Sequence, residues 1–204
     1  MAPPTVGIIG GGVSGLMCAT RLHELGLAPT VFDTGKRHVG GRASSRRLGF
    51  QGVDGKQVSL TVDHAAQFFL CQRAPFCQYV KRWAEAGVVA RWTEPVGVLR
   101  PGAGFRAFPT PENSSPLCRW VAAGDGGMGE LWAGVARELG DVRTNIWVSN
   151  LERTQSGSWR VLDGRGSLLA EVDYVVVAHN GKCADRLMAI GIEVILFGRL
   201  AQRA

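Results

Sequence analysis

The chain has 204 residues, of which 46% are hydrophobic and 20% charged, so it is long and apolar enough to bury a sizeable core. No apolar run approaches the roughly 20 residues that a membrane-spanning helix needs, so we expect a soluble protein without a membrane span. The formal net charge is +6 and 8% of the residues are aromatic, but no nucleic-acid-binding pattern accompanies the charge, so we expect no nucleic-acid partner.

The start of the chain, MAPP, leads so soon into a strand that we expect no targeting peptide. The five cysteines are scattered and form no CxxC pair; they are Cys18, Cys71, Cys77, Cys118 and Cys183. Their spacing suggests neither a zinc site nor a disulfide framework. We therefore expect no metal and a reducing compartment, such as the cytoplasm or the plastid stroma.

The first 33 residues predict a strand, a glycine turn, a helix and a second strand. Thr5 to Ile9 is β-branched and apolar, which is typical of a strand buried on both faces. From Ser14 the apolar residues recur at helical spacing until Gly26, and the segment APTVFD then supplies a strand that ends in Asp33. This pattern indicates a βαβ unit of about 30 residues.

Gly10, Gly12 and Gly15 fit the spacing GxGxxG between this strand and this helix. The first glycine permits a tight turn, the second lets a pyrophosphate approach the backbone, and the third lets the helix pack on the strand. Phosphate oxygens would meet the free N–H groups at the start of the helix. The pattern predicts a dinucleotide site, with a ligand-free structural turn as the alternative.

Asp33 lies eighteen residues after Gly15, where an acid accepts hydrogen bonds from ribose hydroxyls and repels a 2′-phosphate. This placement favours FAD or NAD over NADP. A P-loop is excluded because no Gly-Lys-Ser/Thr follows, and a nucleophile elbow is excluded because Ser14 is not centred in GxSxG.

The middle of the chain predicts shorter elements. We expect a glycine- and arginine-rich loop over residues 40–50, a strand over 58–62 and an amphipathic helix over 75–86. Residues 91–118 hold several prolines and predict short strands and loops of a smaller substrate domain.

A further glycine turn precedes a helix with one apolar face, formed by Leu131, Trp132, Val135, Ala136 and Leu139. Three strand candidates follow at Ile146 to Leu151, Ser158 to Leu162 and Leu168 to Ala178. The first two predict a hairpin, and the third, which contains VDYVVVA, predicts a buried parallel strand.

The segment HVGGRASSRR resembles the glycine–glycine–arginine segment of glutathione-reductase-type flavoproteins, particularly the amine-oxidase superfamily. The resemblance implies that Gly41 and Arg42 line the FAD pyrophosphate; the alternative for Arg42 is a solvated loop charge. TVDHAAQFF is similar to the DHGAQFF segment of renalase-like flavoproteins, which implies that Ala65 and Gln67 lie beside the flavin ring. Ala65 replaces a glycine of that family, which implies a slightly looser approach to the ring.

Three later segments agree with this resemblance. GGMGELWAGVARELG is similar to the family's Gly-Met helix, where the chain returns to the FAD domain. NIWVSNLERTQSGSWRVLDGRG is similar to the family's hairpin, which implies that the Val148 backbone touches adenine. DYVVVAHNGKCADRLM resembles the plant and algal members, which implies that Ala178 lies at the ADP half.

The resemblance covers nearly all of residues 5–188. It implies an α/β, glutathione-reductase-type, FAD-binding Rossmann-like fold with a parallel central sheet, a three-stranded β-meander or hairpin, and a partial substrate domain. The implied FAD-binding domain is 1–70 with 120–187, the substrate-domain segment is 71–119, and 188–204 is an atypical tail. The implied cofactor-binding residues are Gly10, Gly12, Val13, Ser14, Gly15, Asp33, Thr34, Gly41, Arg42, Ala65, Gln67, Val148 and Ala178.

The implied function is an FAD-binding oxidoreductase that passes a hydride from a small amine or a dihydronicotinamide-like substrate to the flavin, with dioxygen or another acceptor as the oxidant. We predict no catalytic residue, because the flavin itself performs the chemistry. For His64 and His179 we favour hydrogen bonding within a loop over a proton relay, which is the alternative. An NAD-binding dehydrogenase or sensor, or a non-catalytic subunit derived from a flavoprotein fold, are the alternatives.

The resembling family continues for more than a hundred residues beyond the point that matches the end of this chain. We therefore expect a fragment, a short form, or a protein that a partner chain or a missing segment completes. In each case the apolar run Val194 to Phe197 is expected to be exposed.

Overall fold

The computed structural model describes residues 2–111, 117–179 and 181–188. The predicted tail therefore lies outside the described residues from residue 189 on, and so does its apolar run. The chain forms two compact units: unit 1 is Met1–Thr34 with Asp141–Ala204, and unit 2 is Gly35–Gly140. The division into FAD-binding and substrate domains stays a prediction. No helix of the described residues is long and apolar enough to cross a membrane.

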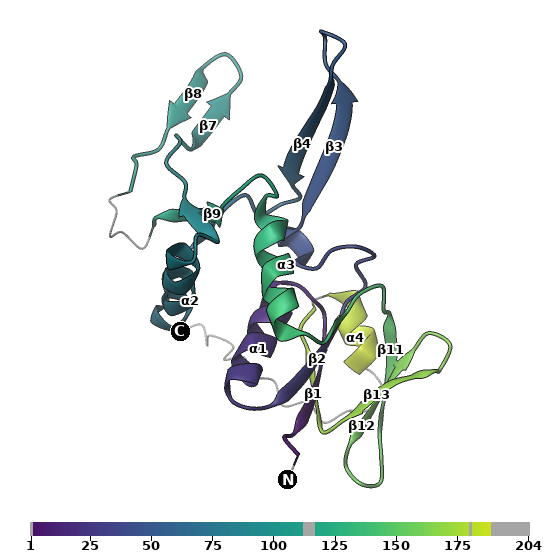
Figure 1. Ribbon diagram of the computed structural model, residues 1–204. Helices are drawn as coiled ribbons and strands as arrows, with labels where there is room; N and C mark the ends of the chain where they lie inside the picture. Colours follow the sequence, from purple (N-terminus) through teal and green to yellow (C-terminus); the bar gives the residue numbers. More distant parts are fainter. Residues whose placement is uncertain (1, 112–116, 180, 189–204) are drawn as a thin grey trace. The chain divides into compact units, whose positions relative to one another are not determined.

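Unit 1 is built on a parallel four-stranded sheet (Figure 1). In spatial order its strands are β10 (Val142–Arg143), β2 (Ala28–Phe32), β1 (Thr5–Ile9) and β14 (Tyr174–Val177). Helix α1 (Val13–Glu24) connects β1 to β2 and packs on both strands. The predicted βαβ unit and parallel central sheet are confirmed.

A three-stranded antiparallel meander completes unit 1, as predicted. Its strands are β11 (Val148–Arg153), β12 (Trp159–Asp163) and β13 (Leu168–Val172). The prediction of one strand from Leu168 to Ala178 is wrong, because the chain leaves the meander at Asp173 and enters the parallel sheet as β14. The Asp173 carboxylate accepts hydrogen bonds from Thr5 N (2.7 Å) and Thr5 Oγ1 (2.8 Å), which ties the start of β14 to the start of β1.

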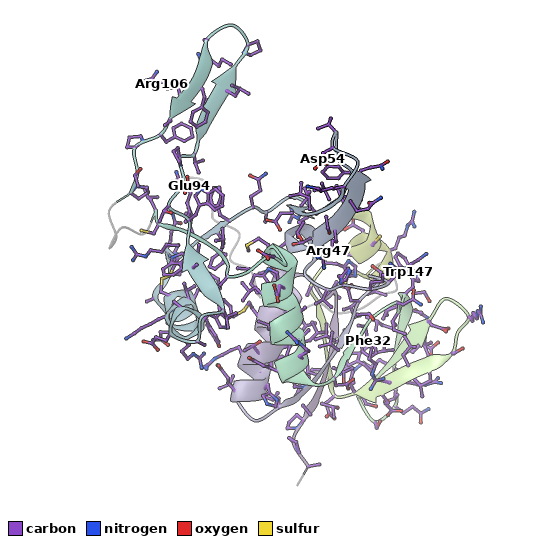
Figure 2. The ribbon with its side chains drawn as sticks, turned by 45° about the horizontal axis from the view of Figure 1, so that its top comes forward. Phe32, Arg47, Asp54, Glu94, Arg106 and Trp147 are labelled. Carbon is purple, nitrogen blue, oxygen red and sulfur yellow. A yellow bond between two sulfur atoms is a disulfide. The ribbon has the colours of Figure 1, made fainter. Side chains whose placement is uncertain are left out.

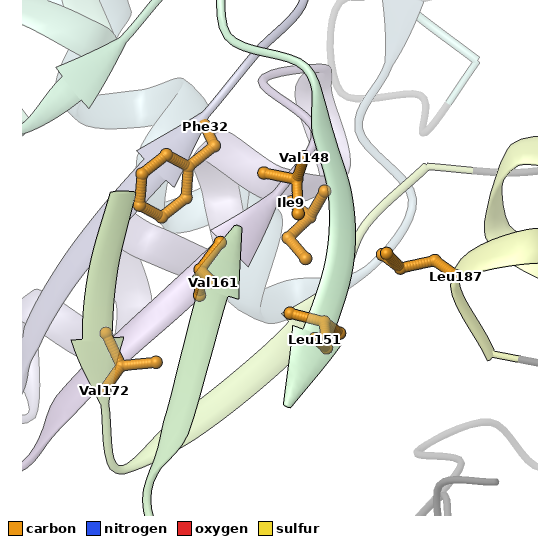
Figure 3. Close-up of a cluster of buried hydrophobic side chains, with 7 residues drawn as sticks. All are labelled: Ile9, Phe32, Val148, Leu151, Val161, Val172 and Leu187. Atoms are coloured by element: carbon orange, nitrogen blue, oxygen red, sulfur yellow. The ribbon is translucent and has the colours of Figure 1, made fainter. Parts of the chain in front are cut away.

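A cluster of buried side chains joins the parallel sheet, the meander and helix α4 (Lys182–Met188) within unit 1 (Figure 3). Its members are Ile9, Phe32, Val148, Leu151, Val161, Val172 and Leu187. They come from five strands and one helix, so burial of this cluster stabilises all three parts together. The core therefore lies directly beneath the ends of β1 and β2.

The short strand β10 has no strong pattern in the sequence, and polar contacts place it. Asp141 accepts hydrogen bonds from Arg143 Nε (2.9 Å) and Thr30 Oγ1 (2.6 Å), and Arg143 Nη1 donates to Leu169 O (3.1 Å). The hydrogen bond from Arg143 is the largest cause that lowers the pKa of the Asp141 carboxyl; burial opposes it, and the hydrogen bond from Thr30 then lowers the pKa further. This network joins the edge of the parallel sheet to the meander.

We expect Asp141→Asn to lower the free energy of unfolding at pH 7 by about 0.5–1 kcal/mol, a modest value because Asp141 and Arg143 are each 44% exposed. A lowered folded-state pKa means that the stabilisation is present above the unfolded value of about 3.9 and is lost as the pH falls through the folded value. Urea denaturation between pH 7 and pH 3 should therefore show the wild-type and variant curves converging below about pH 4. Curves that stay parallel would contradict this role.

The described residues of unit 2 form three small antiparallel sheets, β3-β4, β5-β9-β6 and β7-β8, together with a 3-10 turn and two helices. The bounds are η1 (Gly41–Ala43), β3 (Ser45–Gln51), β4 (Gln57–Asp63), β5 (Phe69–Leu70), α2 (Ala74–Glu85), β6 (Val89–Arg91), β7 (Gly97–Arg100), β8 (Gly104–Ala107), β9 (Arg119–Ala122) and α3 (Met128–Leu139). An edge-to-face contact between Trp83 and Trp132 (5.9 Å between ring centroids) packs α2 against α3, and Phe76 of α2 makes a second such contact with Trp83 (6.0 Å).

Two expectations for unit 2 are wrong. The predicted loop over residues 40–50 is a strand from Ser45 onward, paired with β4 from Ser45↔Asp63 to Gln51↔Gln57; Gly49 and the neighbouring arginines obscure its alternating pattern. The expectation of no disulfide also fails, because Cys71 and Cys77 are bonded. Cys71 follows β5 and Cys77 lies in the first half of α2, which brings their Cα atoms within 5.3 Å.

One face of the β3–β4 hairpin is apolar and exposed. The register sets Leu48 opposite Leu60 and Phe50 opposite Val58, and these four side chains are 38–51% exposed. Because side chains alternate along a strand, the intervening residues form a polar second face, on which Arg47 Nε donates to Ser59 Oγ (2.8 Å). Arg47 and the hairpin residue Asp54 are labelled in Figure 2.

Candidate functional site

The glycine turn after β1 contains two glycines that the fold itself requires. Gly10 has a φ of +114°, and a Cβ there would come within 3.2 Å of Ala178 and His179. A Cβ on Gly15 would lie 1.9 Å from Gly10 O, so only glycine lets α1 pack this closely on the turn. The two positions would need glycine even if no ligand were ever bound.

Gly12 differs from these two glycines because its neighbourhood is open. Its φ is −73°, which any residue can adopt, and a Cβ there would have no neighbouring atom within 4 Å. The fold therefore makes no demand for glycine at this position. An open approach to the backbone is what a pyrophosphate requires at the second glycine of the motif.

The N-terminus of α1 adjoins this open space. Gly12 is the N-cap, no side chain caps the helix, and its first turn holds no acidic residue. Val13, Ser14 and Gly15 form this turn, whose N–H groups have no intrahelical acceptors. With the positive end of the helix dipole, they make a local environment that favours an anion.

Asp33 follows β2 and is held against the glycine turn. Its Oδ2 accepts a hydrogen bond from Gly11 N (2.7 Å), and Gly10 N donates to Phe32 O (2.8 Å). A Cβ on Gly11 would lie 2.8 Å from Asp33 Cβ, so this glycine lets the backbone reach the carboxylate. The motif GxGxxG leaves that position undefined; the only signal for it in the sequence is the run of three glycines.

A cavity of about 370 Å³ opens at the carboxyl ends of β1 and β2. It brings together the predicted residues Gly10, Asp33, Thr34 and Val148. Predicted residue Ala178 lies beneath the turn, where its N donates to Ile9 O (2.8 Å). The lining also includes residues that were not predicted to bind: Ile9, Phe32, Ile146, Trp147, Ser149, His179, Cys183, Arg186 and Leu187.

His179, which lines the cavity, carries a buried side-chain nitrogen with an unmet hydrogen-bonding need. Its Nδ1 is buried and has no hydrogen-bond partner among the described residues. Since buried polar atoms are almost always paired, this nitrogen is available to a bound ligand or a water molecule. A crevice at the carboxyl ends of parallel strands, with such a group, is the usual place for a ligand in an open α/β sheet.

The remaining predicted site residues lie in unit 2, where two of their segments run side by side. Ala66 N donates to Arg42 O (3.0 Å), and His64 N donates to Ser44 O (2.8 Å). These bonds bring Gly41 and Arg42 next to the segment that holds Ala65 and Gln67. All four residues are exposed, and no hydrogen bond or ion pair of the Arg42 side chain occurs within the described ranges. Their role in cofactor binding remains a prediction.

Asp63, which the sequence analysis did not single out, supports the start of α3 in unit 2. Its Oδ1 accepts hydrogen bonds from Met128 N (2.8 Å) and Ser45 Oγ (2.7 Å), and Ser45 Oγ in turn accepts one from Gly129 N (2.7 Å). A carboxylate from β4 thus caps a helix that is distant in sequence. No local pattern could reveal it, because the usual signature places the acid just before the helix.

We expect Asp63→Ala to destabilise unit 2 by about 0.5–2 kcal/mol, because it removes the cap of α3 and leaves two donors unpaired. Asp63→Asn should cost less, since the amide oxygen can still accept. Urea denaturation followed by far-UV circular dichroism measures both variants, with His64→Ala as the matched control because His64 is the exposed next residue. Equal midpoints for Asp63→Ala and His64→Ala would contradict the capping role.

Comparison with known proteins agrees with this geometry. Residues 8–83 match a family described as NAD(P)-binding Rossmann-like domain. Among curated proteins, a tRNA 5-methylaminomethyl-2-thiouridine biosynthesis bifunctional protein of Thiobacillus denitrificans is 26% identical over 91% of this chain and 33% of its own length. The chain thus spans about a third of this relative.

Solved structures of flavoproteins share the fold. A triple mutant of putrescine oxidase superposes with a TM-score of 0.57 at 16% identity, over 91% of this chain and 60% of that one. An FAD-containing monooxygenase of Photorhabdus luminescens gives a TM-score of 0.50 at 15% identity, over 85% of this chain and 39% of that one. The chain therefore has an α/β, Rossmann-like fold that matches the folds of FAD-binding flavoproteins.

Proposed function

We propose that the chain is the FAD-binding part of a flavin-dependent oxidoreductase that resembles renalase-like members of the amine-oxidase superfamily, in particular their plant and algal type. The observation that carries the proposal is the open backbone at Gly12. The motif glycines Gly10 and Gly15 are glycine because the fold requires it, whereas a Cβ on Gly12 would meet no neighbouring atom within 4 Å beside an uncapped helix N-terminus. That combination suits a bound pyrophosphate better than a structural turn without a ligand.

Several residues fit such a cofactor. Gly12, Val13 and Ser14 would offer backbone N–H groups to the pyrophosphate, and Asp33 would accept hydrogen bonds from the adenosine ribose. Val148 would contact the adenine, and Thr34 and Ala178 would line the ADP half of the cofactor. In unit 2, Gly41 and Arg42 would bind phosphate oxygens, because a guanidinium donates two parallel hydrogen bonds to such a group.

The proposed substrate is a small amine or a dihydronicotinamide-like compound, and the proposed oxidant is dioxygen or another acceptor. FAD, when bound, supplies the hydride-accepting chemistry. The chain's own residues bind and orient it: Ala65 and Gln67 would lie along the ring, and the apolar floor of the unit 1 cavity would exclude water from the nucleotide. The similarity to putrescine oxidase and to an FAD-containing monooxygenase supports FAD, while NAD remains the alternative because the matching family is NAD(P)-binding.

We expect the purified wild-type protein to retain FAD and to show the visible absorption bands of a bound flavin. Gly12→Ala should weaken FAD binding at least about tenfold, because its methyl group occupies the space that the pyrophosphate needs. Its apo-protein should melt at the wild-type temperature, since the new Cβ meets no neighbour. Equilibrium titration with FAD and thermal denaturation measure the two effects.

Gly49→Ala is the matched control, because a Cβ there is equally free of neighbours but lies in β3 of unit 2. It should bind FAD as the wild type does. A colourless preparation that binds NAD and not FAD would overturn the proposal, and so would a Gly12→Ala variant with wild-type affinity for FAD.

A second candidate function, a non-catalytic subunit, is favoured by the exposed apolar face of the β3–β4 hairpin. We propose a protein partner for it with apolar side chains flanked by carboxylates. Residues 35–140 hold 14 of the 23 Lys and Arg residues and 8 of the 17 Asp and Glu residues, so the whole net charge of +6 belongs to this segment. An acidic partner would therefore be attracted and a second copy of unit 2 repelled.

Two measurements distinguish the candidate functions: reduction of bound FAD by a substrate, and binding of a helical peptide. If the chain acts as an oxidoreductase by itself, mixing it anaerobically with a small amine or a dihydronicotinamide should bleach the bound FAD. If it acts as a subunit, an amphipathic helical peptide with a leucine face flanked by glutamates should bind. That binding should be lost in the double variant Leu48→Ser/Leu60→Ser and be absent for the same peptide flanked by lysines. Failure of both peptides to bind the wild type would exclude the proposed docking face.

A further inference from the structure

We infer that the indole of Trp147 stacks on the adenine of the bound nucleotide in the unit 1 cavity and strengthens its binding. The inference rests on the proposed function only in assuming that a dinucleotide binds at the glycine turn. It adds a base-binding residue that neither the glycine motif nor the family resemblance supplies.

Trp147 is an exposed aromatic residue at the cavity of unit 1. It is 51% exposed although it lines the cavity, whereas its sequence neighbour Val148 is 8% exposed and belongs to the core cluster. Phe32, which lines the same cavity, is 1% exposed. Phe32 and Trp147 are both labelled in Figure 2. An exposed indole beside an open cavity is a large apolar surface for a flat ligand to cover.

The turn between β12 and β13 comes near one edge of the indole. Gly164 lies in this turn, and a Cβ added to it would lie 3.9 Å from Trp147 Cδ1. Because glycine has no side chain, the turn leaves this edge of the ring uncovered by a side chain at that position.

The cavity has room for one nucleoside. Its volume of about 370 Å³ lies near the lower end of the roughly 300–1,000 Å³ that small-molecule sites occupy. With the pyrophosphate at Gly12 and the ribose at Asp33, the base lies beyond the ribose, inside the cavity. In Rossmann-type sites the ribose that meets this acid belongs to the adenosine half of the dinucleotide, so the base beside Trp147 is adenine.

The cavity wall suits an uncharged aromatic base. Among the described residues that line it, Asp33 is the only carboxylate and Arg186 the only arginine or lysine. Ser149 Oγ is already used in a hydrogen bond to Asp163 O. Most other lining side chains are apolar, which favours stacking over ionic recognition.

Isothermal titration of the FAD-free protein with ADP tests the assignment. Trp147→Leu should weaken ADP and FAD binding about 5- to 100-fold, because a base loses its aromatic platform. Trp147→Phe should stay within about threefold of the wild type, since a phenyl ring also stacks. Trp92→Leu is the matched control: Trp92 is 43% exposed but lies in unit 2, so its loss should leave ADP binding unchanged.

Fluorescence and thermal denaturation separate stacking from a structural role. ADP should quench tryptophan emission in the wild type and in Trp92→Leu but not in Trp147→Leu, and the melting temperature of the apo-protein should be the same in all three. Wild-type ADP affinity in Trp147→Leu, with FAD still bound by the wild type, would overturn this inference and leave the proposed function standing. Failure of the wild type to bind ADP or FAD would overturn both.

Discussion

The hydrogen bond from Gly11 N to the Asp33 carboxylate is the contact on which the nucleotide site of unit 1 depends. It joins the turn after β1 to the end of β2 at 2.7 Å, and it forms only because Gly11 has no Cβ to meet the aspartate. With this bond in place, one carboxylate is fixed beside the cavity and the start of α1 is turned toward open space. The same bond thus positions both the group suited to a ribose and the group suited to a phosphate.

The neighbouring elements hold this arrangement from below and from the side. The core cluster beneath the strand ends contains Ile9 from β1 and Phe32 from β2, so the residues just before the turn and just before Asp33 share one buried environment. Backbone bonds from Asp33 N to Arg143 O and from Ile146 N to Asp33 O then fix the aspartate between β2 and the segment that leads to Trp147. Stability and ligand geometry therefore depend on the same few residues at this edge of the sheet.

The parts of the fold that follow from local pattern could be predicted from the sequence. The βαβ unit combines a β-branched run, helical spacing and a glycine motif, and each of these acts over a few residues. Three other features could not be predicted in the same way: the strand β3, the passage of the chain from the meander to the parallel sheet at Asp173, and the capping of α3 by Asp63. Each depends on a partner elsewhere in the chain. Strand β3 depends on pairing with β4, from Ser45↔Asp63 to Gln51↔Gln57, while Asp173 depends on Thr5 and Asp63 on the start of α3, both far away in sequence. Trp147 escaped notice for a similar reason, since its exposure and its cavity exist only in the folded chain.

The predicted cofactor-binding residues lie in both units, and the proposals make a different demand on each set. Gly10, Asp33 and Val148 lie at one cavity within unit 1, which carries no net charge and is held by its own core. Arg42, Ala65 and Gln67 lie on exposed backbone of unit 2, which carries the whole positive charge. Under the proposed function, an adenine nucleotide without a flavin would need only the first set. We therefore expect ADP binding to respond to substitutions in unit 1, whereas bleaching of FAD by a substrate would test the predicted role of the residues in unit 2.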